Sequence, residues 1–281
     1  RIARRQRQMC IRDRSKVLVL SPMYGEYSHI LKHVIGCHIT YFVLEDRNNF
    51  SIDANDLISQ ACEHDAVIFV NPNSPTGVYC DSMGDIVKQI ACSQNPDSVC
   101  KMIWVDETYI NYLPDAVSLE AMCTVLPELV VCKSMSKCYA LSGLRVAYAV
   151  SQSMSMLKRY IPPWAVSLPG QLAAVAALRN ETYYGEQYEV IHGEREKMQS
   201  ALEASGFRVF PGVANYLLTY LPEESGYSSV GFIEACRARG LFVRDAQNMG
   251  VSLPGNAVRF AVRSVEENKT MLSVVDDVLS M

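Results

Sequence analysis

Lys137 has the surroundings that covalent chemistry requires of a lysine. The apolar residues 129–132 predict a buried strand, and Lys137 follows that strand in a Ser-Met-Ser-Lys turn. A lysine that loses water at a strand end has a lowered pKa, and its neutral amine can attack a carbonyl group. The hydroxyls of Ser134 and Ser136 and the guanidinium of Arg145 suit a phosphate dianion. Pyridoxal 5′-phosphate (PLP) carries both an aldehyde and a phosphate, although a surface lysine behind an ordinary strand would give the same sequence.

The aromatic ring of such a cofactor would need three further contacts. Its pyridine nitrogen stays protonated beside a buried carboxylate, and the apolar residues 102–105 predict a strand that ends in Asp106. Tyr109 could donate a hydrogen bond to the phenolate oxygen of the ring. Tyr24 follows another predicted strand, residues 17–20, and could stack on the ring. Taken singly, Asp106 could instead start a turn or cap a helix, and Tyr24 could be a packing residue.

A stiff polar turn is predicted at residues 71–77, directly after the apolar strand 66–70. It reads Asn-Pro-Asn-Ser-Pro-Thr-Gly, and two prolines with a glycine in seven residues make a rigid turn. In open α/β sheets, ligands bind outside the carboxyl ends of the strands, where this turn would lie. An ordinary connection between a strand and a helix is the alternative.

In this order, the four segments resemble the class I and II aminotransferases, which are PLP enzymes of fold type I. The resemblance covers residues 15–281. The family's motifs are matched by Asn-Pro-Asn-Ser-Pro-Thr-Gly, by Asp-Glu-Thr-Tyr at residues 106–109, and by Ser-Met-Ser-Lys with Gly143 and Arg145. The most similar subgroup is that of the histidinol-phosphate aminotransferases, with threonine-phosphate decarboxylase as a close relative.

The resemblance implies a role for each residue of the cofactor site. Lys137 would bond the cofactor aldehyde. One position departs from the family pattern, because Ser74 stands where an asparagine usually bonds the phenolate oxygen. Serine is shorter, so Asn73 could take over this contact. The other implied contacts are Asp106 with the pyridinium, Tyr109 with the phenolate oxygen, Tyr24 with the ring face, and Ser134, Ser136 and Arg145 with the phosphate.

Arg259 lies inside an apolar segment, residues 258–262, where a cation needs an anionic partner. By resemblance, Arg259 grips a substrate carboxylate. Three further positions match substrate contacts: Arg244, Asn215 and Trp164. Arg244 could instead pair with its neighbour Asp245. The Pro-Pro-Trp segment that contains Trp164, together with Arg263, is more similar to the decarboxylase branch than to the aminotransferase branch.

The resemblance implies an α/β fold of two domains. Residues 15–180 would form a large PLP-binding domain, with a mainly parallel sheet and helices on both faces. Residues 181–281 would form a smaller α+β domain. In this part the sequence itself predicts a long helix at 181–203, a helix at 230–239 and three strands. The predicted strands are 207–210, 216–220 and 258–262.

Composition excludes several classes of function. The chain has 281 residues, 49% of them hydrophobic, and a mean hydropathy of +0.04, so it can bury ample core. A net charge of −4 argues against nucleic acid as the main partner. No apolar run reaches the roughly 20 residues of a membrane span, and no secretory segment is recognised. Ten cysteines without a Cys-x-x-Cys pair, and five scattered histidines, predict no metal site and a reducing, cytoplasmic location.

Residues 1–14 differ from the rest of the chain, because they hold six arginines and one acid. They could be a basic arm for an anionic surface. The preferred interpretation is a non-native extension joined to a family member that is incomplete at its amino-terminal end. The family's amino-terminal region supplies part of the cofactor and partner contacts, so we expect weaker PLP binding and lower stability than in an intact homologue.

Three functions are compatible with these patterns. The first is an aminotransferase that moves an amino group between an anionic, phosphorylated or otherwise charged, amino compound and a 2-oxo acid, and that forms a homodimer when full length. The second is a decarboxylase of the threonine-phosphate type, in which a different bond at Cα is broken. The third is a non-catalytic sensing module with the same fold.

Overall fold

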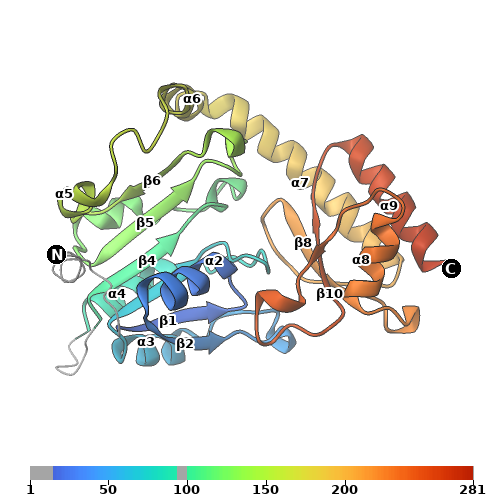
Figure 1. Cartoon of the computed structure of the whole chain (residues 1–281), viewed down its shortest axis with the longest axis horizontal. Helices are drawn as coiled ribbons and strands as arrows, with labels where there is room; N and C mark the ends of the chain where they lie inside the picture. Colours follow the sequence, from blue (N-terminus) through green and yellow to red (C-terminus); the bar gives the residue numbers. More distant parts are fainter. Residues whose placement is uncertain (1–14, 94–99, 281) are drawn as a thin grey trace.

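The computed structural model describes residues 15–93 and 100–280, and its larger sheet has six strands in the order β2-β1-β3-β4-β5-β6 (Figure 1). The five strands from β2 to β5 in this order are parallel, and β6 is antiparallel to β5. The strands are β1 (Lys16–Ser21), β2 (His38–Val43), β3 (Ala66–Val70), β4 (Met102–Asp106), β5 (Leu129–Ser134) and β6 (Ala147–Val150).

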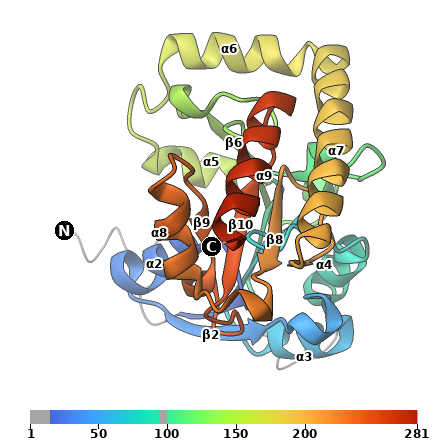
Figure 2. The same cartoon turned by 90° about the vertical axis from the view of Figure 1, so that its right-hand side faces the viewer.

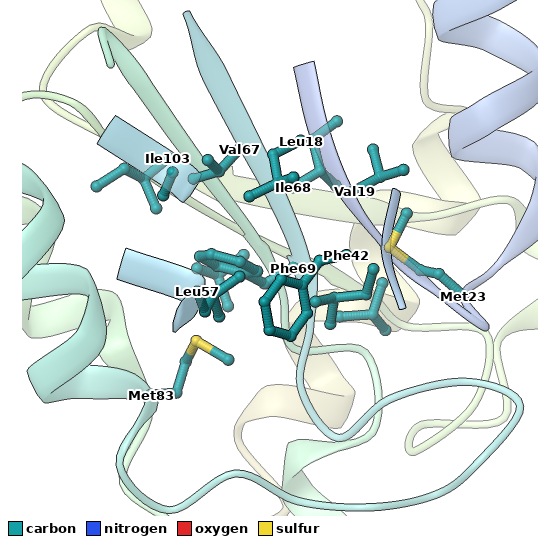
Figure 3. Close-up of a cluster of buried hydrophobic side chains, with 14 of the residues drawn as sticks. Leu18, Val19, Met23, Phe42, Leu57, Val67, Ile68, Phe69, Met83 and Ile103 are labelled. Atoms are coloured by element: carbon teal, nitrogen blue, oxygen red, sulfur yellow. The ribbon is translucent and has the colours of Figure 1, made fainter. Parts of the chain in front are cut away.

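The central strands of this sheet are buried on both faces. All five residues of β3 are buried, as are five of the six residues of β1. A continuous apolar run is typical of parallel strands that are covered on both sides. Figure 3 shows Leu57 of α3 (Ala54–Cys62) and Met83 of α4 (Met83–Ala91) in the same cluster as Phe69 of β3. Between β1 and β2 lie α2 (Gly25–His29) and a π-helical turn (Ile30–Ile35).

A second, antiparallel sheet follows in the carboxyl-terminal part, with the order β7-β8-β10-β9. Phe207, Phe232 and Phe260 pack edge to face in its core. The long apolar stretches of β8 and β10 are the predicted strands, and α8 is the predicted helix at 230–239. The elements are β7 (Arg208–Val209), β8 (Tyr216–Tyr220), α8 (Ser229–Arg237), β9 (Arg244–Asp245), β10 (Ala257–Ala261) and α9 (Val265–Leu279).

The helix α7 (Glu181–Ala204) runs from one sheet to the other (Figures 1 and 2). Near its start, Tyr188 packs on Tyr112 beside the larger sheet, with a ring distance of 5.3 Å. Near its end, Met198 and Leu202 belong to the core of the second sheet. The predicted long helix is therefore confirmed, and it contributes to both cores. The division at residues 180 and 181 stays a prediction.

Two shorter helices precede α7. They are α5 (Met154–Leu157) and α6 (Leu168–Leu178), and an exposed connection joins them. Ser167 caps α6 by accepting a hydrogen bond from the backbone N–H of Gly170.

The predicted fold class is confirmed, with a mainly parallel six-stranded sheet and a smaller antiparallel sheet. Within residues 15–93 and 100–280, no helix has the length and apolar content that a membrane crossing requires. The predicted extension at residues 1–14 lies outside the described residues.

A buried cation lies near the carboxyl end of β5, next to the edge strand β6 of the larger sheet. Lys133 of β5 is 7% exposed, and its Nζ lies 2.7 Å from Glu120 Oε1 and 3.3 Å from Glu107 Oε2. The Ser118 hydroxyl accepts a hydrogen bond from the same Nζ at 2.9 Å and donates one to Glu107 at 2.6 Å. Buried side chains can keep their charged form when they are paired and hydrogen-bonded in this way.

Candidate active site

The three motif segments converge at the carboxyl ends of neighbouring strands. The turn 71–77 follows β3, residues 106–109 end β4, and residues 134–137 follow β5. The strands are in register here, since Val70 lies beside Asp106, and Asp106 beside Cys132. Parallel strands place their carboxyl ends at one edge of the sheet, so the sequence order of the motifs becomes a spatial cluster.

Lys137 lies in the turn after β5. The backbone N–H of Met135 donates to the carbonyl of Val146, which fixes the turn against the next strand. Partial burial lowers the pKa of the Lys137 amine, and the positive charges of Arg259 and Arg145 lower it further. A lowered pKa leaves more of the amine neutral at neutral pH, as a nucleophile toward a carbonyl requires.

The predicted phosphate contacts lie around the same turn. The Ser134 hydroxyl accepts a hydrogen bond from the backbone N–H of Ser136 at 3.3 Å. Arg145 has a left-handed backbone, with φ of 55°, and its Nη1 donates to the carbonyl of Ser142 at 3.0 Å. The remaining N–H groups of its exposed guanidinium are available to an anion, together with the serine hydroxyls.

Asp106 is 9% exposed, and three donors hold its carboxylate. The backbone N–H and the hydroxyl of Thr108 donate to Oδ1 at 2.9 and 2.5 Å. The hydroxyl of Tyr27 donates to Oδ2 at 2.7 Å. Neither Tyr27 nor Thr108 was singled out from the sequence. The available signal was the spacing of Tyr27, one helical turn after Tyr24.

Ser74 links the turn after β3 to the second sheet. Its hydroxyl accepts a hydrogen bond from Arg259 Nη1 at 3.2 Å. The guanidinium of Arg259 lies 4.8 Å above the ring of Tyr216, and the rings of Tyr216 and Tyr109 are 5.2 Å apart. Burial raises the pKa of Tyr109 to about 12, so its hydroxyl keeps its proton at neutral pH and can donate. Ser74, Tyr109 and Arg259 thus form one cluster.

Asn73 has a different role in this turn from the predicted cofactor contact. Its amide nitrogen donates to the carbonyl of Pro22 at 3.0 Å and to the hydroxyl of Thr76 at 3.1 Å, which uses both amide hydrogens. The backbone carbonyl of Asn73 accepts from the buried Tyr216 hydroxyl at 2.7 Å. Asn73 therefore holds the turn in shape, and Ser74 is the residue that faces Tyr109 and Arg259.

Glycines bring the second sheet against this turn. A Cβ atom on Gly212 would lie 2.9 Å from the carbonyl oxygen of Thr76 and 3.0 Å from Gly77 Cα, so only glycine fits. The neighbouring backbone N–H of Val213 donates to the carbonyl of Gly77 at 2.8 Å. The site thus lies where the two sheets meet.

The predicted substrate residues are only partly brought together. Arg244 lies directly opposite Arg259 in the antiparallel pair of β9 and β10, so both side chains leave the same face. The alternative pairing of Arg244 is not seen in the described part of the chain, where Asp245 instead accepts from Ser229 and from the backbone of Gln247.

Three other predicted site residues are Asn215, Tyr24 and Trp164, and they range from a position near the site to one that is almost fully exposed. The backbone carbonyl of Asn215 accepts from the N–H of Val262, at the start of β8, near the cluster of Tyr216 and Arg259. Tyr24 is 48% exposed, and its ring packs edge to face on Tyr27 at 6.1 Å. Trp164 is 94% exposed on the connection before α6, so it lies outside the site of a single chain.

The charges of the site fit PLP. Arg145 and Arg259 both lie close enough to Lys137 to lower its pKa, and in residues 15–93 and 100–280 no carboxylate forms an ion pair with any of the three. A phosphate and a substrate carboxylate would balance these cations. The buried carboxylate of Asp106 suits a protonated ring nitrogen.

Comparison with known proteins agrees with this chemistry. The family model described as aminotransferase class I and II matches residues 5–275. The chain is 27% identical over 248 residues to the histidinol-phosphate aminotransferase of Oleidesulfovibrio alaskensis, with 86% of this chain and 63% of that relative covered. It is also 27% identical over 283 residues to the L-serine phosphate decarboxylase of Sulfurospirillum multivorans, covering 94% of this chain and 68% of the relative.

A solved structure is similar as well. The histidinol-phosphate aminotransferase from Clostridium acetobutylicum superposes with a TM-score of 0.83 at 26% identity, over 95% of this chain and 78% of that one. The chain spans less than two thirds of the length of the Oleidesulfovibrio relative. The match to the family model covers most of the chain, and the three motif segments described above meet at one edge of the larger sheet. This chain belongs to the class I and II aminotransferase family, whose members depend on PLP.

Proposed function

We propose that the chain is a PLP-dependent aminotransferase that acts between an anionic, phosphorylated amino compound and a 2-oxo acid. Bound PLP supplies an electron sink at Cα of the substrate. Lys137 would bond the cofactor aldehyde and would carry the Cα proton. Asp106 would hold the ring nitrogen, Tyr109 and Ser74 would bond the phenolate oxygen, and Tyr24 would cover the ring. Arg145 and the hydroxyls of Ser134 and Ser136 would hold the phosphate.

The observation that carries this proposal is the convergence of three residues where the two sheets meet. Lys137 and Asp106 lie at the carboxyl ends of strands of the larger sheet, and Arg259 reaches them from β10 of the smaller sheet. Titration of the purified chain with PLP, followed by borohydride reduction and peptide mapping, tests it. The expected label is on the peptide that contains Lys137. A folded chain that takes no label, or a label on another lysine, would contradict the proposal.

The substrate side favours a compound with two anionic groups. Arg259 and Arg244 face the same side of the small sheet, and like charges that lie directly opposite each other favour binding of an anion between them. The relatives include a histidinol-phosphate aminotransferase and an L-serine phosphate decarboxylase. Both names contain a phosphate ester, so we choose histidinol phosphate and O-phosphoserine as probes.

The decarboxylase relative makes loss of CO₂ the second candidate. Incubation of the PLP-loaded chain with each probe and 2-oxoglutarate separates the two activities. Transamination is expected to form glutamate, whereas decarboxylation would release CO₂ without consuming 2-oxoglutarate.

Arg259→Ala is expected to raise KM for glutamate and 2-oxoglutarate by roughly 100-fold, because a charge-assisted, partly buried contact to the carboxylate is lost. Steady-state kinetics with varied glutamate measure this change. Arg237→Ala is the matched control, since Arg237 lies on α8 outside the site. An unchanged KM in Arg259→Ala would rule out the carboxylate contact.

We also propose a homodimer, and the exposed apolar residues of α6 support it. Leu168, Leu172 and Val175 are 66%, 64% and 47% exposed and follow one another at helical spacing, beside the exposed Trp164. Leu172→Glu is expected to weaken self-association by about 30-fold, as for an apolar residue central to an interface. Sedimentation velocity over a concentration series measures this, with Val230→Glu on α8 as control. A wild-type chain that stays monomeric at high micromolar concentration would contradict the dimer.

A reducing, cytoplasmic location remains part of the proposal. Four cysteines within the described residues, Cys62, Cys123, Cys138 and Cys236, are buried free thiols. Free buried cysteines are typical of proteins in a reducing compartment.

A further inference from the structure

Two hydrogen bonds lead from the larger sheet to Asp106. The indole Nε1 of Trp104 donates to the hydroxyl oxygen of Tyr27 at 3.0 Å, and that hydroxyl donates to Asp106 Oδ2 at 2.7 Å. Trp104 lies on β4, two residues before Asp106, so both side chains leave the same face of the strand. Tyr27 comes from α2, which packs over this face of the sheet.

The direction of this relay is fixed by the groups that form it. An indole N–H can only donate, and an ionised carboxylate can only accept. Tyr27 must therefore accept from Trp104 and direct its own hydrogen to Asp106. Trp104 thus determines the orientation of the Tyr27 hydroxyl.

The relay also distinguishes the two oxygens of Asp106. Oδ1 accepts two hydrogen bonds, from the N–H and the hydroxyl of Thr108. Each carboxylate oxygen has about two acceptor positions, so Oδ1 is filled. Oδ2 accepts only from Tyr27 among the described residues, and one of its positions remains for a further donor.

The geometry points to Tyr27, oriented by Trp104, as a positioning residue that presents Oδ2 of Asp106 to the ring nitrogen of the cofactor and keeps that carboxylate ionised. This inference rests on the proposed function. The physical reason is that hydrogen bonds donated to a carboxylate stabilise its charged form, so the shared proton stays on the ring nitrogen. Loss of the Tyr27 hydroxyl would make Asp106 a stronger base and draw that proton away from the ring.

The other ionisable groups near Asp106 do not replace Tyr27. Burial raises the pKa of Cys132 to about 12, and the negative charge of Asp106 contributes. Burial likewise raises the pKa of Tyr109 to about 12. Burial and the Asp106 charge also raise the pKa of Tyr27 itself, so all three groups stay neutral around pH 7.

The relay can be tested first without any cofactor. The chain has two tryptophans, and Trp164 is 94% exposed, so a ¹H–¹⁵N spectrum should show two well-separated indole signals that Trp104→Phe assigns. Tyr27→Phe is expected to move the Trp104 signal toward the position of the exposed Trp164 signal. Tyr41→Phe, on the exposed edge strand β2, is the control and should move neither. A Trp104 signal that is unchanged in Tyr27→Phe would overturn the relay.

The second measurement uses PLP labelled with ¹⁵N in the ring. The wild-type complex is expected to show a protonated ring nitrogen, Tyr27→Phe a shift toward the neutral form, and Trp104→Phe an intermediate value. PLP affinity in Tyr27→Phe is expected to fall about 10-fold, as for one hydrogen bond to a charged group. An identical ring-nitrogen shift in wild type and Tyr27→Phe would overturn the inference.

The two failures are distinguishable. A wild-type chain that leaves the labelled PLP free contradicts the proposed function, and with it the role of Asp106 Oδ2, whatever the indole signals show. A wild-type chain that binds PLP on Lys137, with variants that leave the ring nitrogen unchanged, contradicts only the role of Tyr27.

Discussion

Lys137→Ala is expected to lower turnover of the PLP-loaded chain by roughly 100- to 10,000-fold or more. That range is the usual contribution of a positioned proton-transfer group alone, and Lys137 would also lose its bond to the cofactor. The fold should persist, since Lys137 belongs to none of the buried hydrophobic clusters of the described residues. Single-turnover and steady-state assays with glutamate measure the loss, and unfolding midpoints check the fold.

Lys137→Arg separates charge from reactivity in the same experiment. Arginine keeps the positive charge but does not deprotonate in proteins, so this variant is expected to be as inactive as Lys137→Ala. Lys101→Ala, an exposed lysine before β4, is the control. Multiple turnovers at the wild-type rate in either Lys137 variant would contradict its role.

The second large effect is expected on stability rather than on catalysis. Lys133→Met should lower the free energy of unfolding by about 3–5 kcal/mol, because Glu107 would remain as a buried charge without its partner. Glu107 is 1% exposed, so water cannot replace the ammonium. Urea unfolding of wild type and variant measures the difference.

The matched control is an exposed pair. Lys88 lies 3.2 Å from Asp85 on α4, and both side chains are mostly exposed, so Lys88→Met should change stability by less than about 1 kcal/mol. The double variant Lys133→Met with Glu107→Gln is expected to recover part of the loss, since it removes the unpaired charge. A single Lys133 variant as stable as the Lys88 variant would show that the buried contacts of Lys133 do not stabilise the fold.

Four strands of the larger sheet, β1, β3, β4 and β5, could be predicted from the sequence because their apolar runs are continuous. The strands β2 and β6 were not predicted, and most residues of β2 are exposed, so β2 lacks such a run. β3 has the predicted bounds, residues 66–70, since a turn with two prolines ends it at once. β7 is shorter than its predicted segment, residues 207–210, and Phe207 and Phe210 instead pack in the cores on either side of it.

The contacts of the site were harder to predict, because their partners are far apart along the chain. Tyr27 and Asp106 are separated by 79 residues, and Tyr216 and Asn73 by 143. A motif shows which chemistry a residue can perform, but not which distant side chain uses its hydrogen-bonding groups. For this reason the sequence assigned Asn73 to the cofactor, whereas its amide hydrogens hold the turn.

The functional role of Arg259 could be inferred from its neighbours in the sequence. A cation inside an apolar strand is costly unless it has a partner, so a functional contact could be inferred without any structure. The partner in the free chain is Ser74, 185 residues away, and only the meeting of the two sheets reveals it.

The 24 residues of α7 form a single rod about 36 Å long, at 1.5 Å per residue. Its first turns cover Tyr112 beside the larger sheet, and its last turns complete the core of the smaller one. If the polypeptide were divided at the start of α7, the first piece would expose Tyr112. In the second piece, the first turns of α7 would have no larger sheet to pack on. The two sheets are thus not interchangeable modules, and recombination that swaps one of them between relatives must carry matching tyrosines on this helix.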